Sequence, residues 1–252
     1  MPPQGEQLEF GYFGKLPTLG DFIHQHLPQD FANHWHEWLQ RAMAEARESL
    51  AEDFLTYYLN CPAWKFLLAP GVCGAQAVAG LTIPSVDKVG RYFNFTLATV
   101  LPEGVDVCAY ALNNREGFKA LEELALDVLE HDLGKADIET RVRDITGVFS
   151  MIPAARHRFD FATDHLLVSQ DHVRPFADQS GALLSHLLTR ELQDFSVWWY
   201  GMVGQTRSQL MVCSGMPGAE AFRQFLTLGE PPTAGEDLEE TNYVDKILAG
   251  EP

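Results

Sequence analysis

The sequence predicts an α/β fold, a three-layer α/β/α sandwich around a mixed β-sheet. Short apolar segments bounded by Gly and Pro alternate with longer segments whose apolar residues recur every three or four positions. Hydrophobic residues make up 46% of the 252 residues, which is enough for one large core. Three apolar segments between residues 64 and 101 are close enough in sequence to pair antiparallel, and we therefore expect a mixed sheet.

The first predicted element is a strand over residues 8–13, where apolar and aromatic residues run up to Gly14. Residues 14–21 contain one proline and two glycines, which predict a loop. A helix over residues 30–50 then begins at Asp30, a residue type that caps helix N-termini. Its apolar residues are spaced mostly by three, four or seven positions: Phe31, Trp35, Trp38, Leu39, Met43 and Leu50.

Three strands and a helix are predicted next. The strands are apolar segments rich in residues that suit a pleated surface, over residues 64–69, 77–83 and 92–101. Residues 118–129 repeat apolar side chains with acidic residues on the opposite face, which predicts an amphipathic helix. Residues 144–181 show no lasting period, and we expect loops and short elements there.

The C-terminal part of the chain continues this alternation. It predicts a helix, two strands and a helix, over residues 182–192, 197–200, 210–213 and 219–228. We expect all these elements to form a single domain over residues 1–228. Residues 229–252 are predicted to be an acidic extension that begins as a linker, with a short apolar pattern at 243–248 that favours a terminal helix.

The charge of the chain is strongly negative, with a formal net charge of -17 at pH 7. Phosphate backbones and anionic membrane surfaces repel such a protein, so neither nucleic acid nor membrane is an expected partner. The N-terminus lacks the basic and apolar regions of a signal peptide, and no stretch reaches 18 uninterrupted apolar residues. We therefore expect a cytoplasmic protein without membrane insertion.

The cysteine and histidine patterns do not predict a metal site. The four cysteines are scattered without a C-x-x-C pair: Cys61, Cys73, Cys108 and Cys213. This pattern favours reduced, buried thiols over disulfides or zinc ligands. Two H-x-H pairs are present, but His34 and His36 fall within the predicted helix, about 200° apart around its axis, and cannot chelate from one face.

Common nucleotide-binding and hydrolase motifs are missing from the sequence. Gly14-Lys15 is not part of a phosphate-binding loop, because Glu9 stands where that motif has its first glycine and Leu16 replaces the Ser or Thr after the lysine. Neither a G-x-G-x-x-G fingerprint nor a G-x-S-x-G elbow is present. We expect no cofactor.

A hydroxyl, a carboxylate and a guanidinium lie close together at a strand-to-strand connection. Ser85, Asp87 and Arg91 could display a catalytic or anion-binding group there, with a histidine such as His24 as the base. Alternatively, Ser85 and Asp87 hydrogen-bond the backbone of a turn, and Arg91 neutralises Asp87. A structural or binding role is favoured, because nothing nearby supplies the base.

Several stretches together resemble one family. The matching residues read F-G-K-L-P at 13–17, G-D-F at 20–22, P-S-V-D-K-V-G-R-Y-F at 84–93, W-W at 198–199 and S-G-M-P at 214–217, with Trp35 and Trp38 between the first two groups and the third. In this combination, over roughly residues 8–228, the sequence resembles the TagF/ImpM family of type VI secretion accessory proteins. It departs from the family pattern at Asn94, where proline is frequent, and at Met216, where leucine is usual.

The resemblance implies a non-catalytic, post-translational repressor of type VI secretion. Its implied partner is the cytoplasmic scaffold protein that carries a forkhead-associated domain. Some family members are fused to a phosphatase domain, but this chain is too short for one and shows no acidic metal-binding motif. No catalytic residue, metal or cofactor is therefore expected.

We hypothesise that two loops, 15–22 and 85–91, form the partner-binding surface. Polar residues lie amid Gly and Pro on both, and loops on a rigid scaffold often carry binding residues. Charges on Lys15, Asp21, Asp87 and Arg91 would then provide specificity. The candidate binding or family-motif residues are Gly14, Lys15, Pro17, Gly20, Asp21, Phe22, Ser85, Asp87, Gly90, Arg91, Trp198 and Trp199.

Two other functions stay open at this point. One is a hydrolase or ligand-gated sensor that uses Ser85, Asp87 and Arg91. The other is a structural component of the assembled secretion machine. The paired tryptophans, Trp198 and Trp199, are more typical of core packing than of a ligand site.

Overall fold

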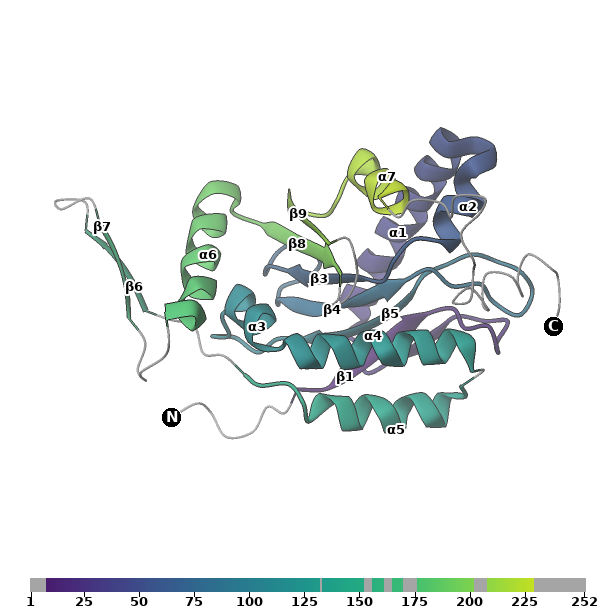
Figure 1. The fold of residues 1–252 in the computed structure, drawn as a ribbon, viewed down its shortest axis with the longest axis horizontal. Helices are drawn as coiled ribbons and strands as arrows, with labels where there is room; N and C mark the ends of the chain where they lie inside the picture. Colours follow the sequence, from purple (N-terminus) through teal and green to yellow (C-terminus); the bar gives the residue numbers. More distant parts are fainter. Residues whose placement is uncertain are drawn as a thin grey trace.

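The protein folds around a seven-stranded sheet (Figure 1). The computed structural model describes residues 8–131, 133–151, 156–160, 165–169, 176–201 and 208–228. The sheet strands are β1 (Phe10–Gly14), β2 (Ile23–Gln25), β3 (Trp64–Leu68), β4 (Val78–Ile83), β5 (Phe95–Val100), β8 (Phe195–Tyr200) and β9 (Gln209–Ser214). Their spatial order is β2-β1-β5-β4-β3-β8-β9, and β6 (Arg156–Asp160) pairs with β7 (His165–Ser169) as a separate hairpin.

The predicted α/β class is confirmed, but the prediction of a mixed sheet is wrong. Each strand pairing in the seven-stranded sheet is antiparallel. A parallel pair needs a crossover connection between neighbouring strands. The long helix after β2 instead leads to β3, which lies four places away from β2 in the sheet, so no such unit forms.

The helices agree with the sequence where the apolar repeat is strong. They are α1 (Gln29–Leu50), α2 (Phe54–Leu59), α3 (Val107–Asn113), α4 (Arg115–Glu130), α5 (Lys135–Thr146), α6 (Phe176–Leu192) and α7 (Ala219–Thr227), with a 3-10 turn η1 (Ala51–Asp53) before α2. The predicted cap was wrong: Pro28 is the N-cap of α1, and Asp30 lies inside the first turn, where its carboxylate accepts from Phe31 N–H. The predicted extension at 229–252 lies outside the described residues.

Alternate strand residues belong to two hydrophobic clusters on opposite faces of the sheet, because successive strand side chains point to opposite faces. One cluster joins sheet residues such as Leu67 and Leu97 to residues of α3, α4 and α5. The other joins sheet residues such as Phe66 and Trp198 to residues of α1, α2 and α7. In Figure 1, α4 and α5 run beside each other along one side of the sheet.

A buried ion pair fastens α4 to the sheet. Lys65 Nζ on β3 lies 2.5 Å from Glu122 Oε2 on α4, and both side chains are almost completely buried. On the other side of the sheet, Trp35 Nε1 donates to Thr96 Oγ1 at 3.1 Å, and Trp38 Nε1 donates to the Pro217 carbonyl at 2.8 Å. These polar contacts fix the position of each helix, because a buried polar group without a partner destabilises the fold.

Among the residues that the structure describes, no helix is both long and apolar enough to cross a bilayer.

Candidate functional site

The structure brings the two predicted loops together. The loop after β1 and the connection between β4 and β5 are in contact along their length, through an ion pair between Lys15 and Asp87 and through three further hydrogen bonds. Ser85 Oγ donates to the Lys15 carbonyl at 2.9 Å, and Lys88 N–H donates to the Leu19 carbonyl at 3.2 Å. The Arg91 guanidinium donates to the Gly20 carbonyl. Residues about 70 positions apart in sequence therefore form one continuous unit.

Asp87 is the centre of this unit. Its Oδ2 lies 2.7 Å from Lys15 Nζ and 2.7 Å from Arg91 Nε. Its Oδ1 accepts the backbone N–H groups of Val89, at 3.0 Å, and of Arg91, at 2.9 Å. The Asp87 side chain is 0% exposed, so these four donors replace the water that would otherwise solvate the carboxylate.

These contacts keep Asp87 ionised. Burial is the largest single influence and raises the pKa of its carboxyl. The hydrogen bonds from Lys15, from the backbone and side chain of Arg91 and from Val89 N–H together outweigh burial and lower the pKa to about 2. At neutral pH the carboxylate therefore holds a negative charge between two cations.

Two glycines allow the backbone to follow this path. Gly14 has a φ of +132°, and a Cβ there would lie 2.1 Å from the Asn94 carbonyl oxygen, so no larger residue fits. Gly90 has a φ of +83° in the turn that Asp87 and Arg91 close through the Asp87 N–H and the Arg91 carbonyl, at 3.0 Å. The left-handed conformation explains the glycine at each position.

Ser85 belongs to a buried polar network beneath the loops. Tyr58 Oη accepts Ser85 N–H at 3.2 Å and donates to Asn94 Oδ1 at 3.1 Å. Asn94 Nδ2 in turn donates to Thr82 Oγ1 at 3.2 Å. Ser85 itself is 0% exposed, and its hydroxyl is engaged with the Lys15 carbonyl. The predicted contact of Ser85 with the backbone of its own turn is therefore replaced by one with the other loop, whereas Asp87 does bind its own turn.

Six exposed residues remain on the outside of the two loops: Asp21, Phe22, Lys88, Val89, Gly90 and Arg91. We call them the two-loop surface. Phe22 is 43% exposed and Val89 is 67% exposed, which is high for apolar side chains. Large exposed apolar groups next to charged ones are typical of protein-binding surfaces.

Phe22 is held in place although it is half exposed. Its ring centroid lies 4.8 Å from that of Phe93 and 5.1 Å from that of His36, both in edge-to-face geometry. Lys15 Nζ lies 5.1 Å from the centroid of the Phe22 ring, within the range of a cation–π contact. The exposed ring is thus supported by the same lysine that binds Asp87.

Not every predicted residue is part of this surface. Lys15 and Asp87 are buried and pair with each other, so they support the loops and do not offer charges to a partner. Pro17 is half-buried in the first loop. Trp198 is 0% exposed and packs against Trp35 and Phe66 in one cluster, whereas Trp199 packs against Phe118 in the other. Trp198 therefore belongs to the core, and Trp199 is partly buried against it.

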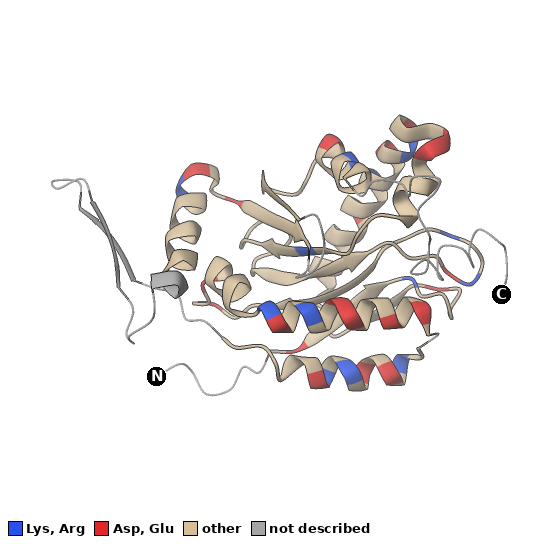
Figure 2. Cartoon of the chain, in the orientation of Figure 1, with Lys and Arg blue, Asp and Glu red and all other residues tan. Residues whose placement is uncertain are grey.

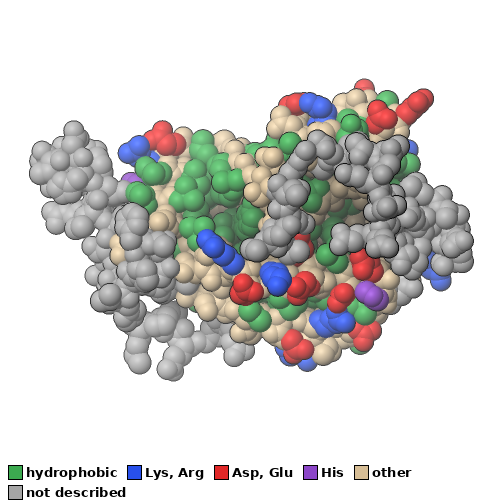
Figure 3. All heavy atoms as spheres, in the orientation of Figure 1, with side chains coloured by type: hydrophobic (Ala, Val, Ile, Leu, Met, Phe, Trp, Pro, Cys, Tyr) green, Lys and Arg blue, Asp and Glu red, His purple; other side chains and the backbone are tan. Residues whose placement is uncertain are grey.

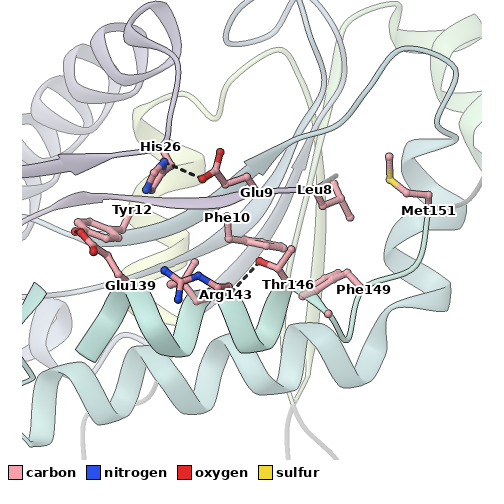
Figure 4. A pocket seen from close by; sticks show the side chains of 12 residues that line it. Leu8, Glu9, Phe10, Tyr12, His26, Glu139, Arg143, Thr146, Phe149 and Met151 are labelled. Atoms are coloured by element: carbon pink, nitrogen blue, oxygen red, sulfur yellow. Dashed lines mark hydrogen bonds and ion pairs between the residues drawn. The ribbon is translucent and has the colours of Figure 1, made fainter. Parts of the chain in front are cut away.

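A groove that the sequence did not predict lies between β1 and α5 (Figure 4). Its volume is about 790 Å³. His26 Nδ1 lies 2.9 Å from Glu9 Oε1 on its rim, and Tyr12 Oη donates to Glu139 Oε1 at 3.4 Å. Burial, and then the charge of Glu139, raise the pKa of Tyr12. Because these residues come from segments far apart in sequence, no local motif could have revealed the groove.

Neither the two-loop surface nor the groove contains a metal-binding cluster among the described residues. Over the part of the chain that the structure describes, no three His, Cys, Asp or Glu residues are grouped so that they could hold a metal ion. Burial raises the pKa of Cys61 and of Cys73 to about 12. Both thiols are therefore protonated at neutral pH.

Comparisons with known proteins agree on one family. The family described as the TagF N-terminal domain, type VI secretion system-associated, matches residues 11–145, a range that contains both loops. The crystal structure of PA0076 from Pseudomonas aeruginosa PAO1 is similar, with a TM-score of 0.71 and 32% sequence identity. That match covers 86% of this chain and 94% of that chain. No curated protein matches this chain.

Proposed function

The chain belongs to the TagF family of type VI secretion system-associated proteins, and from this premise we propose that it is a cytoplasmic, non-catalytic repressor of type VI secretion that binds the forkhead-associated scaffold protein. The observation that carries this proposal is the two-loop surface. It presents an aromatic ring, an aliphatic side chain, two cations and the carboxylate of Asp21, on loops that the buried carboxylate of Asp87 holds together.

Rigidity favours binding by these loops. Fixing a loop before it meets a partner reduces the conformational entropy lost on association. Here Asp87 joins both loops, and Phe22 is positioned by Phe93 and His36. Aromatic residues and arginine also contribute disproportionately to binding energy at protein interfaces. Phe22 and Arg91 are therefore the expected anchors.

The charge of this surface differs from that of the rest of the protein. The chain carries -17 overall, and Figure 2 shows acidic residues spread over α4, α5 and the turn after α1. On the two-loop surface, Lys88 and Arg91 are exposed together with the carboxylate of Asp21, while the nearby Asp87 is buried. A partner with an apolar and acidic face would fit here, and complementary charges would orient it during encounter.

We propose that repression works by stoichiometric binding and not by catalysis. A hydrolase that uses Ser85 would need its hydroxyl to leave the Lys15 carbonyl and reach solvent, and Asp87 to leave four donors. A binder uses the loops as they stand. Repression then follows when each copy of the protein occupies one copy of the scaffold and holds it out of assembly.

Calorimetry with purified scaffold from the same secretion cluster tests the proposal. We expect one-to-one binding with a Kd in the micromolar range or below, about -8 kcal/mol or stronger. The double variant Lys88→Glu, Val89→Asp should weaken binding at least about ten-fold, or about 1.4 kcal/mol. Both side chains are exposed, so the fold should tolerate the changes.

The matched control makes the same kinds of substitution on α4, outside the two-loop surface. Lys119→Glu with Leu126→Asp changes one exposed lysine and one exposed apolar residue on α4, and it should leave the affinity unchanged. Absence of binding by the unmodified protein would remove the scaffold as partner. Binding that neither variant weakens would show that the partner uses another surface.

A further inference from the structure

The edge of the sheet at β9 is open. β9 is the last strand in the sheet order, and within the described part of the chain β8 is its sole strand neighbour. Its six residues, Gln209 to Ser214, include neither a charge nor a proline. Leu210 is 68% exposed and Val212 is 39% exposed. No strand of the described residues therefore lies beside one row of its backbone donors and acceptors.

Edges of this kind are unusual in isolated proteins. Natural sheets protect their edges with short strands, charged side chains, prolines or bulges, because an open edge pairs readily with another chain. The opposite edge follows this rule, since β2 has three residues and carries the exposed His24. β9 is twice as long, and none of its side chains is charged.

An apolar patch continues from β9 onto neighbouring elements. Leu210 and Val212 pair with Trp199 and Val197 of β8 and therefore lie on the same face of the sheet as they do. Exposed leucines of α6 add to this side, namely Leu183, Leu184 and Leu187. Figure 3 shows hydrophobic side chains gathered over α6 and the adjoining part of the molecule.

We propose that β9 pairs antiparallel with β9 of a second copy and extends the sheet across a two-fold axis. A two-fold axis makes identical strands antiparallel, which is the direction of every pairing in this sheet. With Met211 at the axis, Leu210 lies opposite Val212 of the other copy, so apolar side chains meet on one face.

The charge distribution of the protein favours self-association at this edge. Two copies with a formal charge of -17 each repel one another over most of their surfaces. β8 and β9 together carry no charged side chain, so two copies approach here with the least repulsion. The pairing leaves the two-loop surface free, because those loops follow β1 and join β4 to β5. A dimer would thus present two partner-binding surfaces.

Sedimentation velocity of the full chain over a wide concentration range tests this proposal, in a buffer with enough salt to screen surface charge. We expect the mass to rise from one copy to two as concentration increases. Leu210→Lys with Val212→Lys should stay monomeric at every concentration, with unchanged circular dichroism. Leu112→Lys with Leu126→Lys, two exposed apolar residues on α3 and α4, is the matched control and should still dimerise.

Hydrogen exchange of the unmodified protein gives a second readout that needs no variant. The amides of β9 should exchange more slowly at high concentration than at low concentration, because pairing protects them. A monomer at all concentrations would overturn the proposal. A dimer that persists in the β9 variant, or one in which exchange slows elsewhere and not at β9, would assign the interface to another surface.

Discussion

At the scale of single residues, Asp87 determines the geometry of the candidate site. One carboxylate receives Lys15 from the first loop, Arg91 from the second and two backbone N–H groups from its own turn. Buried ion pairs that are fully hydrogen-bonded often specify one arrangement more than they add stability. We infer that Asp87 fixes the position of the two loops relative to each other.

Replacing Asp87 by Asn should give a pH-dependent loss of stability. The folded-state pKa of about 2 lies below the ordinary value of 3.8, so the carboxylate stabilises the fold fully above that value, and its contribution falls as the pH drops toward 2. In urea unfolding, the stability gap between the two proteins should narrow by about 1 kcal/mol between pH 7 and about pH 3.

A comparison with Asp21→Asn controls for the loss of one negative charge, because Asp21 is exposed on the same surface. If the gap between the unmodified protein and the Asp87→Asn variant stayed constant across this pH range, the ionised carboxylate would not be the stabilising group. The measurement requires the folded state to persist at the acidic end, which the unfolding curve itself reports.

The residue chemistry of the site was only partly predictable. Ser85, Asp87 and Arg91 suggested either a catalytic group or a hydrogen-bonded turn; Asp87 and Arg91 do make the turn contacts, whereas Ser85 binds the other loop. Lys15 was predicted to present its charge to a partner and is buried instead. Its partner lies 72 residues away, and a sequence does not reveal a contact of that range.

At the scale of elements, predictability followed the strength of the local pattern. β3, β4 and β5 are short apolar runs bounded by Gly or Pro and were predicted close to their observed bounds. α5 was missed because only Ile138 and Val142 are buried along its 12 residues. α2 and α3, with six and seven residues, are too short to show a period.

Strand direction could not be predicted because it depends on contacts remote in sequence. β1 pairs with β5, and β3 pairs with β8, across long intervening segments that permit either direction. Alternating helices and strands suggested parallel neighbours, but successive strands across α1 are placed far apart in the sheet.

The junction between β3 and α4 provides a test at this scale. Lys65→Met leaves Glu122 buried without its cation and should destabilise the protein by about 3–5 kcal/mol. The double variant Lys65→Met, Glu122→Leu should recover most of that loss, because it buries no unpaired charge. Urea unfolding midpoints of the single and double variants measure both effects.

The control pair lies on the same helix. Lys119 and Glu123 form an exposed pair one turn apart, and Lys119→Met should cost less than about 1 kcal/mol. If the double variant were no more stable than Lys65→Met alone, the unpaired charge of Glu122 would not be the cause of the loss.

At the scale of the whole molecule, the fold places different surfaces at different ends of the sheet. The two-loop surface lies where β1 ends and where β4 joins β5, while the uncharged edge lies at β9. Figure 2 shows acidic residues over α4, α5 and the turn after α1, and the formal net charge is -17. This division agrees with our two proposals, which assign the scaffold partner to the two-loop surface and a second copy to the edge at β9.

The most direct test is hydrogen exchange of the full chain with and without saturating scaffold protein. We predict slower exchange in two segments, residues 15–22 and 84–93, because a bound partner would cover both loops of the two-loop surface. β9 and α4 should exchange at the same rate in both states. Protection confined to other segments, or no protection at saturation, would contradict the account that these loops bind the scaffold.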